Sequence, residues 1–417
     1  IIDEEQILQL PLDDHRKAII YDKFIQLETM QNNNAEYGKL KEWVGWILKL
    51  PWNKSHSFNS LSISNQTINQ TNDKTNDQIS NQTINQISNQ TLEQKTSINE
   101  FMQKIKTELD AVYGLINAKE EIMLFVLKKY LQSFKPNDSN NKKTSIGGQI
   151  LAIEGPPGVG KTYLLKHLAN AIQIPFESVP LGGCKDASFL DGHGFTYEGS
   201  MPGRIVQALK NLQCNDGIIY FDEIDKLSDT NNGQEVSALL LHILDPSQNK
   251  EFYDKYISDI PIDLSKIFFV LSINDREKID PVLRQRLFII KIPAPTLQDK
   301  VEIAHQCMIP QLMKEYQFQE NDVIISKDIL RHLIQTKTND EKGVRNLQHI
   351  LTSVYKRIYF LKNIVNGNDT KNTMNLSFWL SDFKLPFTLN HQNLNILLKG
   401  TDQHENNLDT NVQKIYI

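Results

Sequence analysis

Residues 155–162 decide the fold of this 417-residue chain, and they read Gly155-Pro156-Pro157-Gly158-Val159-Gly160-Lys161-Thr162. They satisfy the pattern G-x-x-x-x-G-K-[ST], whose backbone N–H groups wrap around phosphates at the N-terminus of a helix. The apolar run 150–153 before them predicts a buried strand, and a helical pattern begins near Lys161. Because strand, loop and helix follow one another in the order that the pattern needs, we interpret 155–162 as a phosphate-binding loop and not as a glycine-rich turn that matches by chance.

Two side chains of this loop predict the ligand. Lys161 is expected to neutralise the β- and γ-phosphates of a nucleotide, and the Thr162 hydroxyl is expected to ligate Mg²⁺. The sequence therefore predicts ATP and Mg²⁺ as cofactors, with all of residues 155–162 in contact with the nucleotide.

The apolar run 218–221 ends in two adjacent acids, Asp222 and Glu223. Asp222 is placed to hold hydrated Mg²⁺, and Glu223 can orient and polarise an attacking water. Two acids after a strand also occur in ordinary polar turns, but here one βα unit separates them from the phosphate loop. The pair thus predicts nucleotide hydrolysis and not only binding.

Three further polar residues follow in an order that fits a nucleotide-hydrolysing site. Asn274 ends the apolar run 267–273, where its amide can reach between the γ-phosphate and the water. Arg286 is a candidate arginine finger that acts on the nucleotide of a neighbouring subunit. Arg345 opens a predicted helix and could reach back to the phosphates. Each residue alone would be assigned to a turn or a surface ion pair, so only their order supports the catalytic interpretation.

Short apolar runs alternate with helix-length amphipathic segments between residues 149 and 295. Such alternation predicts an α/β fold with a parallel sheet and helices on both faces. From 296 to 365 only helical patterns appear, which predicts a small all-helical domain. The apolar runs cover 150–153, 176–181, 218–221, 267–273 and 287–292.

Composition divides the rest of the chain. Residues 56–97 are rich in Asn and Gln, and Ser64–Gln70 recurs almost unchanged as Ser80–Gln86. Such a tract buries too little apolar surface to offset the entropy of ordering, which predicts a disordered insertion. The predicted parts are a helical neck (1–55), this insertion (56–97), a helical entry (98–148), the α/β nucleotide-binding domain (149–295), the helical domain (296–365) and an Asn-rich tail without an assigned role (366–417).

Charge and cysteine usage narrow the class of protein. The net charge of −5 counts against a dedicated nucleic-acid binder, since such proteins are more often basic. No apolar run approaches a membrane span. The three cysteines are far apart and lack metal-ligand spacing. They predict a reducing compartment, the cytoplasm or the mitochondrial matrix, and not a secreted protein.

The order of loop, acid pair, asparagine and arginines resembles that of AAA+ ATPases, and further segments resemble the Lon-type ATP-dependent proteases. The resemblance covers about residues 5–55 and 100–362. The segments that carry it are Trp46–Asn53, Tyr113–Leu115, Tyr197–Ile205 with its Pro202-Gly203-Arg204, Asp222–Leu227, Leu244–Pro246 and Gly343–Leu347.

The resemblance implies an AAA+ module preceded by a helical neck, assembled as a homohexameric ring that hydrolyses ATP to pull unfolded or misfolded polypeptide through a central pore. It places Tyr113 beside the adenine and Tyr197 in the pore loop that grips substrate. An aromatic ring can grip unrelated sequences because its contacts are apolar and undirected.

The sequence departs from the family at three places. Glu198 follows the pore tyrosine where the family usually has an aliphatic residue, and Val112 replaces a common histidine. No segment after Arg345 resembles the small-residue-rich serine segment of the family's Ser–Lys dyad. The resemblance therefore implies no peptidase activity for this chain alone.

Three alternatives differ from a protease motor. The first is a stand-alone unfoldase or chaperone without a protease partner. The second is an AAA+ ATPase that acts on nucleic acid, such as a helicase or clamp loader, which the Pro-Gly-Arg segment, the neck and the acidic balance disfavour. The third is a nucleotide-dependent scaffold with little turnover, which the intact Glu223, Asn274 and Arg286 disfavour.

Overall fold

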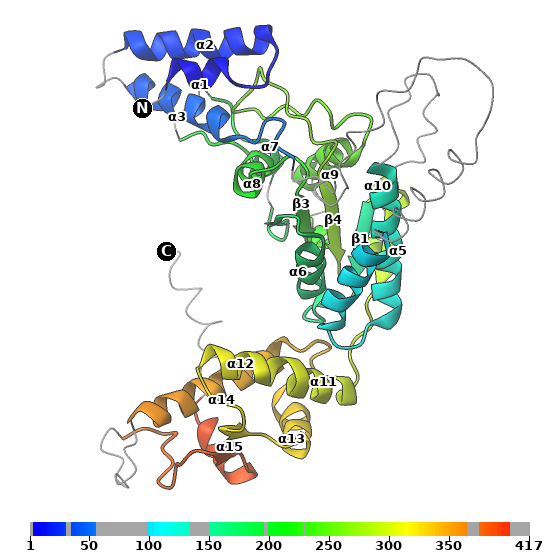
Figure 1. Cartoon of the computed structure of the whole chain (residues 1–417), viewed down its shortest axis with the longest axis vertical. Coiled ribbons are helices and arrows are strands. Elements are labelled where there is room, and N and C mark those ends of the chain that lie inside the picture. Colours follow the sequence, from blue (N-terminus) through cyan, green and yellow to red (C-terminus); the bar gives the residue numbers. More distant parts are fainter. Residues whose placement is uncertain are drawn as a thin grey trace, which may run out of the picture. The chain divides into compact units, whose positions relative to one another are not determined.

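The computed structural model describes residues 3–30, 35–55, 98–133, 150–184, 186–195, 199–227, 231–364 and 375–400. The Asn/Gln-rich segment 56–97, with its predicted disorder, lies outside these residues. The chain forms two compact units (Figure 1). The first unit comprises Ile1–Leu109, Ile116–Gly155 and Lys161–Ile292, and the second comprises Asp110–Leu115, Pro156–Gly160 and Pro293–Ile417.

The first unit is built on a five-stranded sheet whose neighbouring strands all pair in parallel, which confirms the predicted fold class. Its spatial order is β2-β3-β4-β1-β5. The β4 strand is buried over its whole length, as expected where helices cover both faces of a sheet. The strands are β1 (Ile150–Glu154), β2 (Phe176–Pro180), β3 (Ile218–Asp222), β4 (Phe268–Ile273) and β5 (Leu287–Lys291).

Helices pack on this sheet through apolar faces. On α5, Phe125 stacks on Phe268 of β4 and Phe288 of β5, with ring centroids 5.8 and 5.6 Å apart. None of the helices in the described part of the chain is long and apolar enough to cross a membrane. The helices are α5 (Ile116–Ser133), α6 (Lys161–Ile172), α7 (Ser188–Asp191), α8 (Arg204–Leu212), α9 (Asn231–Leu244) and α10 (Pro281–Gln285), with the 3-10 turns η2 (Ile224–Lys226) and η3 (Arg276–Lys278).

The N-terminal helices α1 (Glu4–Leu8), α2 (Asp14–Thr29) and α3 (Ala35–Lys49) share the core of the first unit. Trp43 on α3 is fully buried, and its indole N–H donates to the carbonyl of Tyr256 at 3.0 Å. The predicted neck is therefore packed against the body that carries the sheet. Residues 98–110 form a further helix, which ends before the left-handed Gly114 and Leu115.

In its described residues, the second unit is helical apart from one short parallel pairing, between β6 (Val323–Ile324) and β7 (Phe387–Thr388). The sequence predicts no role for 366–417, but residues 375–400 complete the core of this unit with Leu380, Phe383 and Leu397, among others. Residues 365–374 and 401–417 lie outside the described part. The helices are α11 (Leu297–Ile303), the π-helical η4 (Ala304–Met308), α12 (Ile309–Glu315), α13 (Lys327–Lys337), α14 (Arg345–Ile364) and α15 (His391–Leu397).

Candidate functional site

The carboxyl ends of β1, β3 and β4 carry the predicted site residues. These three strands are neighbours in the sheet, and parallel strands end at the same edge (Figure 1). Gly155 follows β1, Asp222 ends β3, and Asn274 follows β4. Ligands of open α/β sheets bind beyond this edge, so the topology brings together residues that are far apart in the sequence.

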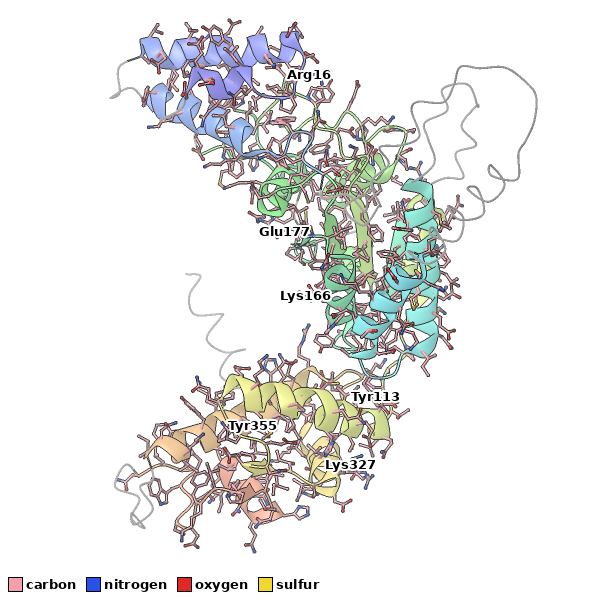
Figure 2. All side chains as sticks on the ribbon, in the orientation of Figure 1. Arg16, Tyr113, Lys166, Glu177, Lys327 and Tyr355 are labelled. Carbon is pink, nitrogen blue, oxygen red and sulfur yellow. The ribbon has the colours of Figure 1, made fainter. Side chains whose placement is uncertain are left out.

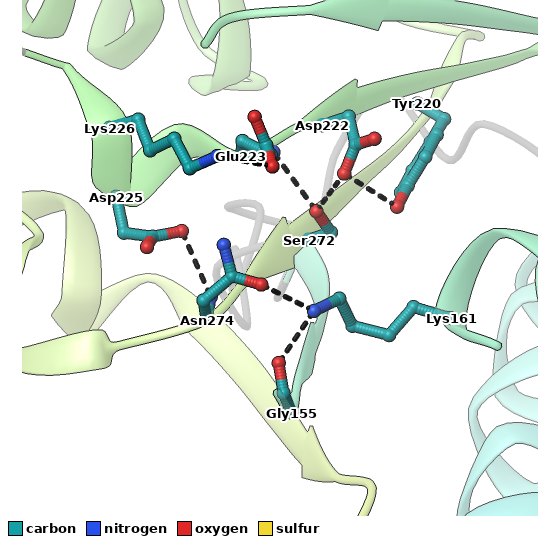
Figure 3. Close-up of polar contacts among 9 residues, drawn as sticks. All are labelled: Gly155, Lys161, Tyr220, Asp222, Glu223, Asp225, Lys226, Ser272 and Asn274. Carbon is teal, nitrogen blue, oxygen red and sulfur yellow. Dashed lines mark hydrogen bonds and ion pairs between the residues drawn. The ribbon is translucent and has the colours of Figure 1, made fainter. Parts of the chain in front are cut away.

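The phosphate loop begins where β1 ends, and α6 begins at Lys161. Gly158 and Gly160 have φ of 77° and 91°, in the left-handed region that favours glycine. Lys161 is only 7% exposed, and its ammonium donates to the Gly155 carbonyl at 2.5 Å and to Asn274 Oδ1 at 2.6 Å (Figure 3). The cation is therefore held between the ends of β1 and β4.

Glu223 adopts a left-handed backbone conformation, with φ 58° and ψ 46°. Non-glycine residues in this region are held there by their surroundings and cluster at functional sites. Two contacts hold Glu223: its N–H donates to Ser272 Oγ at 3.0 Å, and its Oε1 lies 2.6 Å from Lys226 Nζ. A Cβ at Gly182 would collide with Glu223 Oε2, so a larger residue at this position would push the carboxylate away from its present place.

Asn274 is fixed from both sides. Its backbone N–H donates to Asp225 Oδ1 at 2.9 Å, while its side-chain oxygen accepts from Lys161 (Figure 3). Asp225 is buried, and it follows Glu223 in the 3-10 turn η2. The turn after β3 therefore positions the residue after β4.

Three side chains that the sequence reasoning missed complete this edge: Tyr220, Ser272 and Asp225. The Tyr220 hydroxyl lies 3.2 Å from Thr162 Oγ1 and 3.0 Å from Asp222 Oδ1, and the Ser272 hydroxyl donates to the same Asp222 oxygen. Tyr220 and Ser272 stand two residues before Asp222 and Asn274, inside apolar runs. Since side chains alternate across a strand, a polar residue at this spacing shares the face of the site residue, and this signal could have found both.

Arg286 follows α10, outside this cluster of contacts. Its Nη1 lies 2.9 Å from Asp245 Oδ2, and its side chain is 39% exposed. The pKa of Asp245 is lowered, first by the Ser247 hydroxyl and also by Arg286. Arg284 makes a separate ion pair with Glu277 at 2.8 Å. In the isolated chain the predicted finger is therefore paired with an acid of its own subunit.

The second unit contains the middle of the phosphate loop together with Arg345. Val344 N–H donates to the Gly158 carbonyl at 3.0 Å, and a Cβ on Gly158 would meet the Cβ of Arg345 at 3.3 Å. Gly343 makes this approach possible, because a Cβ there would lie 2.5 Å from the Gly158 carbonyl carbon. Arg345 thus begins α14 beside Gly158 of the loop, and its contact with the phosphates stays a prediction.

For the other predicted residues, Tyr113, Tyr197 and Glu198, the structure gives few or no contacts. Tyr113 is half-buried in the segment Asp110–Leu115, which belongs to the second unit. Tyr197 and Glu198, the predicted pore-loop residues, lie outside the described residues, as does Thr196. The flanking Phe195 packs edge-on against Tyr256, with ring centroids 5.7 Å apart.

The oxygen atoms of Thr162 and Asp222 fit a hard cation. Mg²⁺ prefers oxygen ligands and is bound through few protein groups, with water and phosphate filling its other positions. The two residues come within reach of one phenol hydroxyl, so they are close neighbours at the sheet edge. Among the described residues, no three His, Cys, Asp or Glu side chains form a separate metal-binding group.

The known proteins that this chain matches are AAA ATPases and Lon proteases. The profile of the ATPase family associated with various cellular activities (AAA) matches residues 151–296. The chain is 34% identical over 333 residues to the Lon protease of Lawsonia intracellularis, an overlap that spans 80% of this chain and 34% of that protein. It is 34% identical over 358 residues to the Lon protease of Fusobacterium nucleatum subsp. nucleatum, spanning 86% of this chain and 40% of the relative.

The mitochondrial Lon protease homolog of Saccharomyces cerevisiae is 31% identical over 354 residues, which is 85% of this chain and 27% of that protein. The chain thus spans less than half the length of these relatives, and the matches extend well beyond the AAA segment in each case.

Proposed function

This chain is the AAA+ ATPase portion of a Lon-type protein and hydrolyses ATP, and from this premise we propose that it couples hydrolysis to the unfolding and translocation of protein substrates. The observation that carries the ATPase part of the proposal is the cluster at the sheet edge. There the side chains of Lys161 and Asn274 hydrogen-bond each other, Ser272 donates to the carboxylate of Asp222, and Lys226 donates to that of Glu223.

Each residue of the cluster has a distinct part in the proposed hydrolysis. The Lys161 ammonium binds the β- and γ-phosphates, exchanging its present acceptors for phosphate oxygens. Thr162 and Asp222 hold Mg²⁺, which supplies neutralisation of phosphate charge when bound. Glu223 takes a proton from the water that attacks the γ-phosphorus, and the bond to the bridging oxygen breaks to release ADP. Asn274 orients that water.

The neighbourhood of the predicted pore loop supports a mechanical role. Lys23 of α2 lies over the ring of Trp43 at 3.9 Å and over that of Phe195 at 5.2 Å, so the neck contacts the residue next to the loop. On the other side, Asp254 accepts from the Gly203 N–H at 2.8 Å, and Asp254 is fully buried. A loop anchored at both ends can transmit force to a polypeptide that its tip contacts.

We place the ATPase in a reducing compartment, the cytoplasm or the mitochondrial matrix. The proposal rests on Cys184, Cys214 and Cys307, which lie far apart in the sequence and suit a compartment where disulfides do not persist. The assembly we propose is a homohexameric ring, in which Arg286 of one subunit would serve the active site of its neighbour.

Lys161→Ala is expected to weaken nucleotide binding by about 100-fold, because phosphates would enter a buried loop without its cation. Isothermal titration with ADP and ATP measures the change. Lys166→Ala is the matched control, since Lys166 is an exposed lysine on the same helix (Figure 2). Near-normal ATP affinity in Lys161→Ala, with Lys166→Ala also normal, would refute the assignment of the phosphate site.

The purified chain is expected to show ATPase activity that rises on addition of casein, an unfolded protein, and that does not rise on addition of DNA. It is expected to leave the casein uncut, since no segment after Arg345 resembles the family's serine segment. The measurements are phosphate release and gel electrophoresis of the casein. Stimulation by DNA alone would favour the nucleic-acid alternative, and ATP-dependent casein fragments would contradict the motor-only interpretation.

Tyr197→Ala should keep the basal ATPase rate and lose the casein response, because only the grip on substrate changes. Glu198 should make cationic unfolded chains better activators than acidic ones, through attraction at the constriction. A full casein response in Tyr197→Ala would remove the pore-loop assignment without touching the ATPase assignment.

A further inference from the structure

The phenol of Tyr220 stands between the two residues expected to hold Mg²⁺. Its hydroxyl lies 3.2 Å from Thr162 Oγ1 at the start of α6 and 3.0 Å from Asp222 Oδ1 at the end of β3. Tyr220 comes from β3 itself, two residues before Asp222, so both side chains share one face of the strand (Figure 3). One hydroxyl therefore connects the phosphate loop to the acid pair.

The chemistry of the three groups fixes which atom donates in each hydrogen bond. An ionised Asp222 can only accept, so the proton of Tyr220 points to Oδ1. The phenol oxygen then has only lone pairs left, and Thr162 must donate its proton to Tyr220.

With these donor directions, Thr162 Oγ1 and Asp222 Oδ2 keep lone pairs that can bind a cation. Because the proton of Thr162 is engaged by Tyr220, the lone pairs of Thr162 Oγ1 point elsewhere. Asp222 Oδ1 takes two donors, Tyr220 and Ser272, while no described residue donates to Oδ2. One oxygen of the carboxylate is thus satisfied by the protein, and the other is open to Mg²⁺ or to a water bound to it.

The position of Tyr220 is fixed by packing. The residue is fully buried, and its ring lies against Phe176 of β2, with centroids 5.6 Å apart. An immobile ring presents its hydroxyl at a constant place without losing rotamer freedom on metal binding. An apolar residue in this buried strand would fill the same space but would leave Thr162 and Asp222 without their shared partner.

We propose that Tyr220 is a positioning residue of the Mg²⁺ site, which orients the hydroxyl of Thr162 and one oxygen of Asp222 so that both present lone pairs to the cation. The inference deepens the proposed function and rests on it, because it concerns the same nucleotide site. The inference adds the hydroxyl of Tyr220 to the residues that form the metal site, next to the hydroxyl of Thr162 in the phosphate loop.

The test uses Tyr220→Phe, which removes one oxygen and keeps the ring against Phe176. Binding of a fluorescent ADP analogue is measured without Mg²⁺ and over a series of MgCl₂ concentrations, and no turnover is needed. In the variant, we expect the Mg²⁺ concentration for half-maximal enhancement of binding to rise about tenfold, the effect of losing hydrogen bonds to a charged metal ligand. The affinity without Mg²⁺ should stay within about twofold of wild type, because Tyr220 has no direct contact with the nucleotide in this proposal.

Tyr355→Phe is the matched control. Tyr355 lies fully buried in the core of the second unit (Figure 2), and no described residue makes a hydrogen bond to its hydroxyl. This substitution also removes a buried phenol oxygen, so it should leave the Mg²⁺ midpoint unchanged.

The outcomes separate the inference from the proposed function. If wild-type protein binds the ADP analogue with a Mg²⁺ enhancement and Tyr220→Phe shows the same midpoint, the role of Tyr220 is overturned while the nucleotide site stands. If Tyr220→Phe loses affinity equally with and without Mg²⁺, Tyr220 has only a structural role and the inference is again overturned. If wild-type protein shows no nucleotide binding at all, the proposed function itself fails.

Discussion

Glu223→Gln is expected to bind ATP with near-normal affinity and to hydrolyse it about 10³-fold more slowly, within the range that general acid–base catalysis contributes. The amide keeps the size of the side chain and cannot accept the proton of the attacking water. The backbone contact to Ser272 Oγ at 3.0 Å does not involve the side chain, so the left-handed conformation should survive. Single-turnover hydrolysis and nucleotide titration measure the two effects separately.

The ion pair between Glu223 and Lys226 gives this prediction a second part. At 2.6 Å, Lys226 holds the carboxylate in the described state, and Glu223 must leave it to face the water. Lys226→Met should therefore change turnover by far less than Glu223→Gln, because the lysine restrains the base and does not replace it. Glu251→Gln, at an exposed glutamate of the same unit, is the control for loss of one carboxylate. Turnover in Glu223→Gln within a few-fold of wild type would show that another group accepts the proton.

The sheet and the main groups of the site could be predicted because both follow short-range rules. Each strand begins within one residue of the run that predicted it, and β1, β3 and β4 are buried along most of their length. The phosphate loop is a contiguous pattern, and Asp222, Glu223 and Asn274 mark the ends of strands. Parallel pairing brings the carboxyl ends of the strands to one edge of the sheet whatever the order of the strands, so the common edge could be predicted without that order.

The contacts that refine the site depend on three-dimensional proximity, which local patterns do not contain. Tyr220 and Ser272 are polar residues inside apolar runs, and the runs were interpreted only as core. Their hydroxyl groups reach the site because β3 and β4 are neighbours, and because Thr162 on α6 lies within hydrogen-bond distance of Tyr220. Strand order was not predicted, so these pairings were not predicted either.

Residues 375–400 were assigned no role for a different reason. Their Asn-rich composition suggested a tail without pattern, yet seven of their apolar residues are buried in the second core: Leu380, Phe383, Phe387, Leu389, Leu394, Leu397 and Leu398. The apolar positions are spread over a bend, a two-residue strand and one short helix, and no element is long enough to show a period. The pairing of β7 with β6 supplies the order that the sequence pattern lacks.

Arg286→Ala is expected to lower the ATPase rate by about 10³-fold, the lower end of the range for loss of an arginine finger. In the described chain its guanidinium lies 2.9 Å from Asp245 Oδ2 of the same subunit. Assembly would bring a phosphate close enough to compete with Asp245 for this cation. Specific activity should therefore rise with protein concentration, because dilution separates the arginine from the site that it serves. Arg284→Ala is the matched control, since Arg284 is two residues away and pairs with Glu277.

Mixing the two inactive variants distinguishes action between subunits from action within one. In a ring, each site takes its glutamate from one subunit and its arginine from the next, so a site formed by an Arg286→Ala subunit and a Glu223→Gln neighbour has both groups intact. Random 1:1 mixing places about a quarter of the sites in this arrangement, because a head-to-tail interface is directional. An equimolar mixture of Glu223→Gln and Arg286→Ala subunits should thus recover roughly a quarter of the wild-type rate, provided that subunit exchange is shown by fluorescence transfer between labelled chains. If exchange is complete and the mixture stays inactive, Arg286 serves its own subunit or no nucleotide at all, and the pairing with Asp245 is then its structural role.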